Sequence, residues 1–415
     1  MDGARFHLRH VGLGGAGAEL AVDAVARGQD DFLALGHGDE RRNVRMEAIV
    51  TGRRLISQTL ATVDLDALHD GSPVDYAAIM TDKPPHVYVI LGNAQWDFAD
   101  CQTALSRVPA RMFSLPQTEV EDEMIARTRD ADALVVSSAP VTRGVMSALE
   151  GLKVVVRTGV GYDVIDVPAA TELGVIVVNI PDLWIREVAN HALALLLAWN
   201  RGVVVMDRQV RAGAWSGRVP GSHTGALHGE TVGIVGLGNI GSAFARRVAA
   251  LETKVIACDP YVDDERFAAL GVERVSLETL AERADYVSVH TLLNAETRHL
   301  IGEAFFTRMK PTAILINTSR GPVVDEQALA RALRDKRLAG AALDVWEEEP
   351  VAASNPLLKM DNVIATPHAA YYSSAAVAQI PGRCGEEVAR VLTGQRARNV
   401  VNPEVYAPGA ARRAR

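Results

Sequence analysis

His368 follows a short apolar run and a proline in the stretch IATPHAAYY, residues 364–372. A lone histidine is more often a satisfied core residue than a functional one, but its imidazole is also well suited to carry a proton near neutral pH. The acidic run Glu347, Glu348 and Glu349 precedes it. One carboxylate beside the imidazole would fix its tautomer and stabilise its protonated form, and we expect the other two to be solvated.

Arg320 stands just after the apolar run AILIN, and Asp344 ends the next apolar run, AALD. An arginine at the carboxyl end of a strand suits a two-point grip on a small carboxylate, although surface ion pairs are the commoner use of arginine. Arginine, carboxylate and histidine therefore follow separate strands. In an open parallel sheet the carboxyl ends of the strands share one edge, where ligands bind.

A glycine-rich turn in TVGIVGLGNIGSAF has the spacing G-x-G-x-x-G, which is a weak signal by itself. Here a strand-like run precedes it, a helix-like run follows, and Asp259 ends the next strand-like run 18 residues after the last glycine. Such glycines let the backbone approach a pyrophosphate at a helix N-terminus, and the acid accepts hydrogen bonds from the adenosine ribose. An aspartate there repels a 2′-phosphate, which favours NAD over NADP. The candidate nucleotide loop consists of Gly236, Gly238, Asn239, Ile240 and Gly241.

Residues 1–84 form an extension of unknown role. They contain a second G-x-G-x-x-G, GLGGAG at residues 12–17, which lacks both the strand and the acid and is interpreted as a flexible loop. The stretch MEAIVTGRRLISQTLATV, residues 46–63, is predicted to be helical.

From about Pro85 onward, short β-branched runs alternate with helix-length segments. This alternation predicts an α/β fold with two doubly wound parallel-sheet, Rossmann-like domains. Long helix candidates at residues 183–201 and about 373–393 flank the middle block. We therefore predict an NAD-binding domain at 184–367 inserted into a substrate domain made of 85–183 and 368–400, followed by a tail at 401–415.

The composition is that of an ordinary globular chain of two or three domains, with 415 residues and a net charge of −8. This charge provides no basic surface for nucleic acid or for a membrane, so neither partner is expected. Cys101, Cys258 and Cys384 lack the spacing of a disulfide framework or a zinc site. We expect a cytoplasmic protein without a metal, since the N-terminus also lacks the apolar core of a signal peptide.

The motifs VGIVGLGNIG, NTSRGPVVDEQAL, GAALDVWEEEP and TPHAAYYS occur in this order. Over roughly residues 85–400 the chain resembles the D-isomer-specific 2-hydroxyacid dehydrogenase family. The resemblance implies hydride transfer between NAD(H) and C2 of a small 2-oxo or 2-hydroxy acid. Arg320 would anchor the carboxylate, and His368 would act as acid or base with Glu349 orienting it. It also implies a homodimer, cofactor contacts from Thr291, Thr318 and Asp344, and a backbone approach to the substrate at Gly159, Val160 and Gly161.

Substrate identity is less well determined by the sequence. Phosphoglycerate dehydrogenases tend to carry an Arg-Ser-x-Thr stretch where this chain has VVSSAPVTRG, although Arg143 and Arg157 could partly replace that arginine. Val164 stands where family members usually have asparagine. Tyr371 stands where the C-terminal-binding-protein branch usually has tryptophan, and it would shape the pocket. That branch suggests an alternative function, an NAD(H)-sensing binding protein that keeps the dehydrogenase fold.

Overall fold

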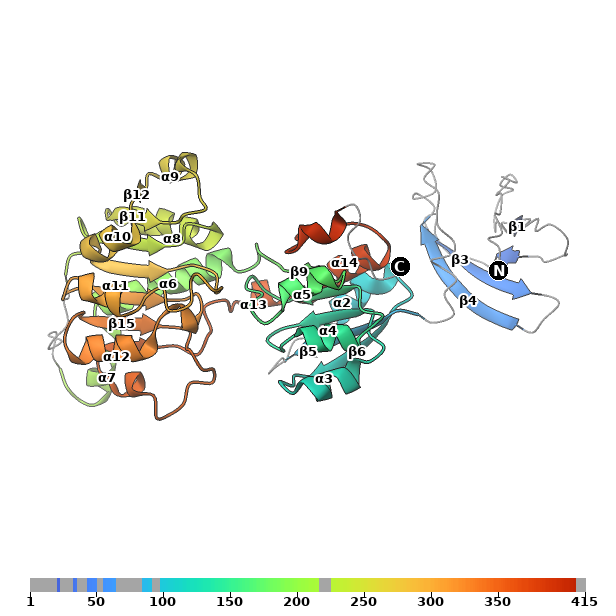
Figure 1. Cartoon of the computed structure of the whole chain (residues 1–415), viewed down its shortest axis with the longest axis horizontal. Coiled ribbons are helices and arrows are strands. Elements are labelled where there is room, and N and C mark those ends of the chain that lie inside the picture. The colour runs from blue at the N-terminus through green and yellow to red at the C-terminus, as the bar shows by residue number, and fades with distance from the viewer. Residues whose placement is uncertain are drawn as a thin grey trace.

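The computed structural model describes residues 84–91, 98–215 and 225–407, together with the backbone of four strands closer to the N-terminus. These residues form three sheets of four, five and seven strands. Figure 1 shows the seven-stranded sheet and its helices on the left, the five-stranded sheet in the middle and the four-stranded sheet on the right.

The five-stranded sheet is parallel throughout, with the order β6–β5–β7–β8–β9. Apart from the edge strand β6, its strands are apolar runs buried on both faces, so that Val87 and Val89 pack into one core while Tyr88 and Ile90 pack into another. The strands are β5 (His86–Leu91), β6 (Arg111–Pro116), β7 (Ala133–Val136), β8 (Val154–Arg157) and β9 (Ile176–Val178). The helices between them are α2 (Ala99–Ala104), α3 (Glu121–Thr128), α4 (Arg143–Ala148) and α5 (Val167–Glu172).

The seven-stranded sheet is also parallel, with the order β12–β11–β10–β13–β14–β15–β16. From β10 the chain adds β11 and β12 on one side and then adds β13 to β16 on the other side of β10. This change of direction places a topological switch point at the carboxyl end of β10. The strands are β10 (Thr231–Val235), β11 (Lys254–Cys258), β12 (Glu273–Arg274), β13 (Tyr286–Val289), β14 (Ile314–Asn317), β15 (Gly340–Leu343) and β16 (Val363–Ala365). The helices are α8 (Asn239–Ala249), α9 (Asp264–Leu270), α10 (Leu277–Arg283), α11 (Glu303–Arg308) and α12 (Glu326–Arg334).

The chain crosses between these two sheets twice. The first crossing leads into α6 (Ile185–Asn200) and α7 (Val203–Arg211), and the second leads into α13 (Ser374–Val377) and α14 (Ile380–Leu392). Because α14 packs on α2 and β8, the chain returns to the five-stranded domain after completing the other one. The predicted α/β class and the inserted arrangement are therefore confirmed, while the predicted return helix is two helices.

The last described residues also belong to the five-stranded domain. Val400 bridges to Val178, and the side chain of Asn402, 1% exposed, accepts a hydrogen bond from the Val177 N–H at 2.8 Å. Among the described residues no single helix is long and apolar enough to cross a membrane. The bent pair α6 and α7 passes that test by length and composition only.

The four N-terminal strands form an antiparallel sheet: β1 (Ala21–Val22), β2 (Leu33–Leu35), β3 (Asn43–Val50) and β4 (Leu55–Asp64). The helix predicted at residues 46–63 is therefore wrong. This stretch is rich in isoleucine, valine and threonine, whose branched side chains favour extended backbone. The GLGGAG loop predicted at residues 12–17 lies outside the described residues.

Candidate active site

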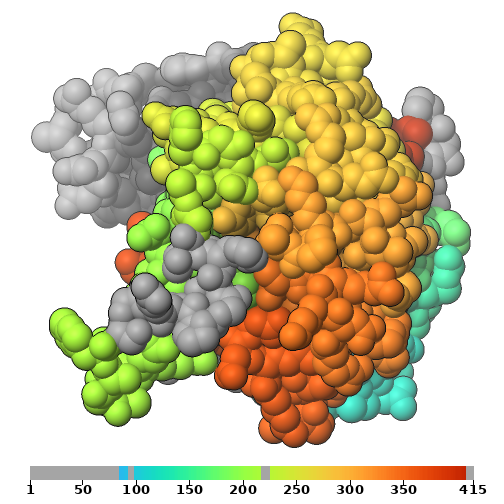
Figure 2. All heavy atoms as spheres, turned by 90° about the vertical axis from the view of Figure 1, so that its left-hand side faces the viewer, coloured from blue at the N-terminus to red at the C-terminus, as the bar shows by residue number. Residues whose placement is uncertain are grey.

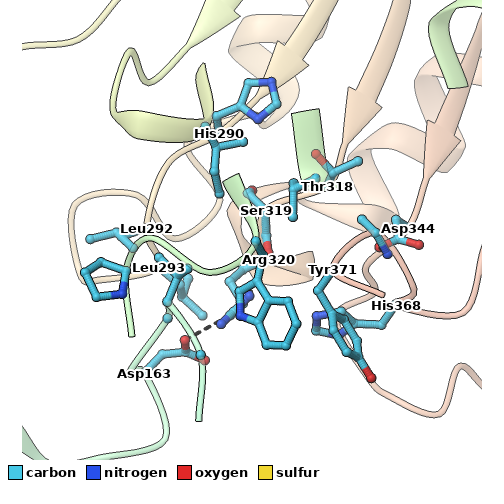
Figure 3. A pocket seen from close by; sticks show the side chains of 18 of the residues that line it. Asp163, His290, Leu292, Leu293, Thr318, Ser319, Arg320, Asp344, His368 and Tyr371 are labelled. Atoms are coloured by element: carbon cyan, nitrogen blue, oxygen red, sulfur yellow. Dashed lines mark hydrogen bonds and ion pairs between the residues drawn. The ribbon is translucent and has the colours of Figure 1, made fainter. Parts of the chain in front are cut away.

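A cleft of about 610 Å³ lies where the carboxyl ends of the two parallel sheets face each other. Figure 3 shows Arg320 at its centre, with Asp163 on one side and with His368 and Tyr371 on the other. The cleft therefore brings together residues from both domains that lie far apart in the sequence. It is lined by all three predicted catalytic residues, Arg320, Glu349 and His368.

His368 is held beside Glu349 by a hydrogen bond of 2.6 Å between Nδ1 and Oε2. The other carboxylate oxygen of Glu349 accepts the Trp346 N–H at 3.0 Å, which fixes the orientation of the carboxylate. Both side chains are about one third exposed, at 38% and 34%, so that solvent and ligands can reach them. The other two acids in the run, Glu347 and Glu348, are both exposed. Glu347 also accepts the Glu326 N–H and lies 3.0 Å from Nε2 of His299.

The loop that carries His368 is fixed by Asp344, which is completely buried. The Asp344 carboxylate accepts the N–H groups of Ala369 at 3.0 Å and Ala370 at 2.9 Å, and its carbonyl accepts the N–H of His368 at 2.7 Å. His368 has a φ of +50°, a left-handed conformation that costs a non-glycine residue about 1–3 kcal/mol. The bonds to Asp344 offset this cost, so Asp344 positions the histidine.

A second layer supports Asp344. The Thr366 hydroxyl donates to Asp344 Oδ1 at 2.5 Å, and Nε2 of His191 on α6 lies 3.1 Å from that hydroxyl and 3.4 Å from the same carboxylate oxygen. On the same helix, Glu187 accepts a hydrogen bond from Ser373 at 3.1 Å. Helix α6, at the first crossing between the domains, therefore contacts residues on both sides of His368 in the second crossing.

Arg320 follows β14 and reaches across to the other domain. Its Nε donates to Asp163 Oδ1 at 2.9 Å and its Nη1 to the Ser319 carbonyl at 2.9 Å. Arg320 lowers the pKa of the Asp163 carboxyl through its charge and hydrogen bond, although burial alone would raise that pKa. A side chain at Gly161 would overlap the Arg320 guanidinium and would displace it from this position.

The predicted nucleotide loop forms the turn between β10 and α8. Gly236 has a φ of +93°, and a side chain at Gly241 would overlap the carbonyl of Gly236, so both positions require glycine. A side chain at Gly238 would meet nothing within 4 Å, which leaves open space before the first free N–H groups of the helix. Asp259 at the end of β11 accepts the N–H of Leu237 at 2.8 Å and so binds the loop itself.

Two hydroxyls in the cleft, those of Thr291 and Thr318, are buried and have no hydrogen-bond partner in the described protein. Buried polar groups are normally satisfied, so these hydroxyls fit a bound ligand such as the nicotinamide end of NAD. His290 beside them also has a buried atom without a hydrogen-bond partner, its Nδ1. Burial lowers its pKa to about 3, and its Nε2 lies 2.9 Å from the Ser288 hydroxyl. It therefore stays neutral.

The structure separates the predicted cofactor residues into two groups. Gly236, Gly241 and Asp259 shape the loop without lining the cleft. The cleft is lined by Gly238, Asn239, Ile240, Thr291, Thr318 and Asp344.

On the substrate side, the loop after β8 lines the cleft with Arg157, Gly159, Val160 and Gly161. The Val160 carbonyl accepts a hydrogen bond from Asn179 at 2.7 Å, which fixes the loop. Tyr371 also lines the cleft, and its ring packs edge-on against Trp184 with centroids 5.1 Å apart. Among the described residues, no group of three potential metal ligands is present.

Several cleft residues were not predicted from the sequence. Ser137 and Ser138 follow β7, so the rule that places ligands at the carboxyl ends of parallel strands could have identified them. Trp184 lies just before α6 and had no comparable signal. The pairing of Asp163 with Arg320 joins residues 157 positions apart, which no local pattern indicates.

A family model described as "D-isomer specific 2-hydroxyacid dehydrogenase, NAD binding domain" matches residues 193–370. A glyoxylate reductase of Korarchaeum cryptofilum is 43% identical over 285 residues, which are 68% of this chain and 86% of that protein. A D-3-phosphoglycerate dehydrogenase of Methanocaldococcus jannaschii is 42% identical over 285 residues, but the match spans 68% of this chain and only 54% of that protein. The structure of D-lactate dehydrogenase from Aquifex aeolicus with NAD and lactic acid is similar with a TM-score of 0.68 and 27% identity, over 76% of this chain and 99% of that one.

The similarity is therefore not limited to the motifs. It covers 86% of the glyoxylate reductase sequence and 99% of the D-lactate dehydrogenase structure. The chain belongs to the D-isomer-specific 2-hydroxyacid dehydrogenase family and is an NAD-dependent enzyme.

Proposed function

We propose that this enzyme interconverts a small 2-oxo acid and its D-2-hydroxy acid, with His368 as the acid or base, Glu349 orienting it and Arg320 holding the substrate carboxylate. The observation that carries this proposal is the 2.6 Å contact between His368 and Glu349 in the cleft that Arg320 also lines. A positioned histidine with a carboxylate partner is the arrangement that proton transfer requires.

The nucleotide loop and the two unpartnered threonine hydroxyls support a cofactor site that runs from α8 into the cleft. The nicotinamide of the bound cofactor supplies or accepts the hydride. Thr291 and Thr318 would hold the nicotinamide end, and Asp259 would accept hydrogen bonds from the adenosine ribose. Each oxygen of Asp259 already accepts one backbone N–H, from Leu237 or Tyr261, and a carboxylate oxygen can accept a further bond. A carboxylate here disfavours a 2′-phosphate, so we propose NAD rather than NADP.

The proton reaches the substrate oxygen through His368. Because Glu349 occupies Nδ1, Nε2 is the nitrogen left for the substrate. In the reducing direction the hydride adds to C2, the carbonyl electron pair moves to oxygen, and Nε2 gives its proton to that oxygen. Glu349 stabilises the charged imidazole before this transfer, and in the oxidising direction the neutral ring takes the proton back.

Arg320 would bind the substrate carboxylate and stabilise the charge that develops on the neighbouring oxygen. The Nη2 end of its guanidinium lies against Gly161, on the loop where the backbone of Gly159 and Val160 is expected to approach the substrate. Arg157 and Tyr371 complete the proposed substrate pocket. Glyoxylate and 3-phosphohydroxypyruvate are the substrate candidates that the names of the relatives suggest.

We also propose a homodimer that uses the arm formed by α6 and α7. Val203 and Val210 on α7 are exposed, and so is Trp215 shortly after the helix, whose side chain is 93% exposed. Exposed apolar side chains on a projecting element are typical of protein contacts, and Figure 2 shows the yellow-green segment around α7 standing out from the body. The domain boundaries at 84/85, 183/184, 367/368 and 400/401 and the cytoplasmic location stay predictions.

The test is NADH oxidation by the purified chain with glyoxylate, pyruvate, hydroxypyruvate, 3-phosphohydroxypyruvate and longer 2-oxo acids, followed by chiral analysis of the product. We expect at least one acid to be reduced to the D-2-hydroxy acid. If none is reduced while NADH still binds tightly, the proposal is wrong and the NAD(H)-sensing alternative gains support.

A further inference from the structure

Arg157 is a second cation in the cleft, separate from Arg320, and it has no anion of its own. Its Nε is buried without a hydrogen-bond partner, and its Nη1 donates to the Thr158 hydroxyl at 3.2 Å. Among the described residues no carboxylate forms an ion pair with it. Burial, with repulsion from Arg320, lowers the pKa of Arg157 to about 10, so it is still charged at neutral pH. A buried charge that lacks a protein partner is stabilised when a ligand supplies one.

The two guanidiniums lie along the same short loop. A side chain at Gly159 would lie 2.8 Å from Arg157 Nη1, and a side chain at Gly161 would overlap the guanidinium of Arg320. The Cα atoms of residues two positions apart are at most about 7 Å from each other. Each guanidinium therefore lies beside a different glycine of this loop, so the loop carries two positive groups into one cleft.

The partners of the two arginines differ. Asp163 feels the charge of both, but its hydrogen bond goes to Arg320, which also donates to a backbone carbonyl. The other arginine suggested by the sequence, Arg143, lies on the surface, where it pairs with Glu172 at 2.7 Å and does not line the cleft. Arg157 is thus the cation whose negative partner is missing.

We propose that the substrate carries a second anionic group, and that Arg157 binds this group while Arg320 binds the 2-oxo carboxylate. This inference rests on the proposed function and narrows its substrate to 2-oxo acids that carry a second anionic group. Ser137 lines the same cleft after β7, and its hydroxyl suits the oxygens of a carboxylate or a phosphate. The neighbouring Ser138 hydroxyl already donates to Gln117 Oε1 at 2.7 Å. A guanidinium group can bind either anion through two hydrogen bonds, so the experiment must distinguish a carboxylate from a phosphate.

The experiment compares kcat/KM for NADH-dependent reduction of matched pairs that differ in the second charge. The carboxylate pair is 2-oxobutanoate and oxaloacetate, and the phosphate pair is hydroxypyruvate and 3-phosphohydroxypyruvate. We expect the wild-type enzyme to prefer the acid with the second anionic group in at least one pair by roughly 10- to 100-fold, the worth of a hydrogen bond to a charged group. The pair with the larger preference identifies the second anion as carboxylate or phosphate.

Arg157→Gln should remove this preference by slowing reduction of the acid with the second anionic group far more than reduction of its partner, whereas Arg157→Lys should keep part of the preference. Arg143→Gln is the matched control, since it removes an arginine from the surface of the same domain and should keep the wild-type ratio. NADH binding by fluorescence reports whether each variant is folded. If the glutamine variant does not fold, the ratios of the wild type and of the lysine variant decide the question.

Two results would overturn the inference. The first is a wild-type enzyme that reduces the two members of both pairs equally well. The second is an Arg157→Gln variant that loses the same factor for both members of a pair, because Arg157 would then act on the shared carboxylate. Either result leaves the proposed function standing, whereas failure of the wild type to reduce any 2-oxo acid would refute the proposed function instead.

Discussion

The two sides of the cleft differ in how their polar groups are satisfied. Around His368, the carboxylates of Asp344 and Glu349 accept hydrogen bonds from named protein donors. Around Arg157 and the two threonines, buried atoms have no protein partner. The first side is built before any ligand arrives, and the second is completed by the ligand. Removing a group around His368 should therefore lower the stability of the protein or its kcat. Removing a group around Arg157 or the threonines should mainly weaken the binding of substrate or cofactor.

The largest effect is expected for His368→Gln. Glutamine can still hydrogen-bond but cannot transfer a proton at neutral pH, so kcat should fall by roughly 10² to 10⁴-fold. NADH affinity should stay close to that of the wild type. Steady-state kinetics and fluorescence titration measure the two quantities, and near-normal turnover would remove His368 from the mechanism.

Gly161→Ala should have the next largest effect. The new methyl group would overlap the guanidinium of Arg320 and displace it. Misplacing a substrate-positioning group can cost about 100-fold, so kcat/KM for the oxo acid should fall by that order while NADH still binds. Gly382→Ala is the control, because the nearest atom to its added methyl is 4.0 Å away. Equal kinetics in both variants would contradict the position of Arg320.

Asp344→Asn tests the supporting layer. The asparagine amide would place a donor against one of the N–H groups of Ala369 and Ala370, and leaving a buried donor unsatisfied costs about 1–3 kcal/mol. We expect a lower free energy of unfolding by that amount and a reduced kcat, because the His368 loop loosens. Chemical denaturation gives the first value, with the exposed Asp335→Asn as control. Unchanged stability would show that Asp344 does not hold the loop.

Thr318→Val should show the opposite pattern and the smallest effect. Its hydroxyl has no protein partner, so its loss should leave the stability of the ligand-free protein unchanged or slightly raised. The Kd for NADH should rise roughly 2- to 10-fold, since one hydrogen bond contributes about 0.5–1.5 kcal/mol. A clear loss of stability without cofactor would mean that the hydroxyl is satisfied within the protein.

Much of the fold was predictable because parallel strands buried on both faces appear as unbroken apolar runs; AILIN and AALD, for example, contain the strands β14 and β15 or most of them. β6 and β12 were missed because their residues are largely exposed or only partly buried and carry no apolar run. The helix predicted at residues 46–63 was wrong because β-branched residues in this stretch favour the strands β3 and β4 that form.

The site was predictable where residues lie in sequence motifs and not where contacts cross the domains. The motifs indicated Arg320, Glu349 and His368, and the structure places all three in one cleft. The sequence suggested both Arg143 and Arg157 near the substrate, and only the structure shows which one lines the cleft. The partnership of Asp163 with Arg320 depends on how the two domains meet, which local patterns do not contain.

The most direct test of the central claim is a double-mutant cycle of His368→Gln and Glu349→Gln, measured as kcat for NADH-dependent reduction of the best 2-oxo acid. If Glu349 acts only by orienting and charging His368, its substitution should slow the wild-type enzyme but add almost nothing once the histidine is gone. Two losses that simply multiply in the double variant would contradict the account, because the carboxylate would then act independently of the imidazole.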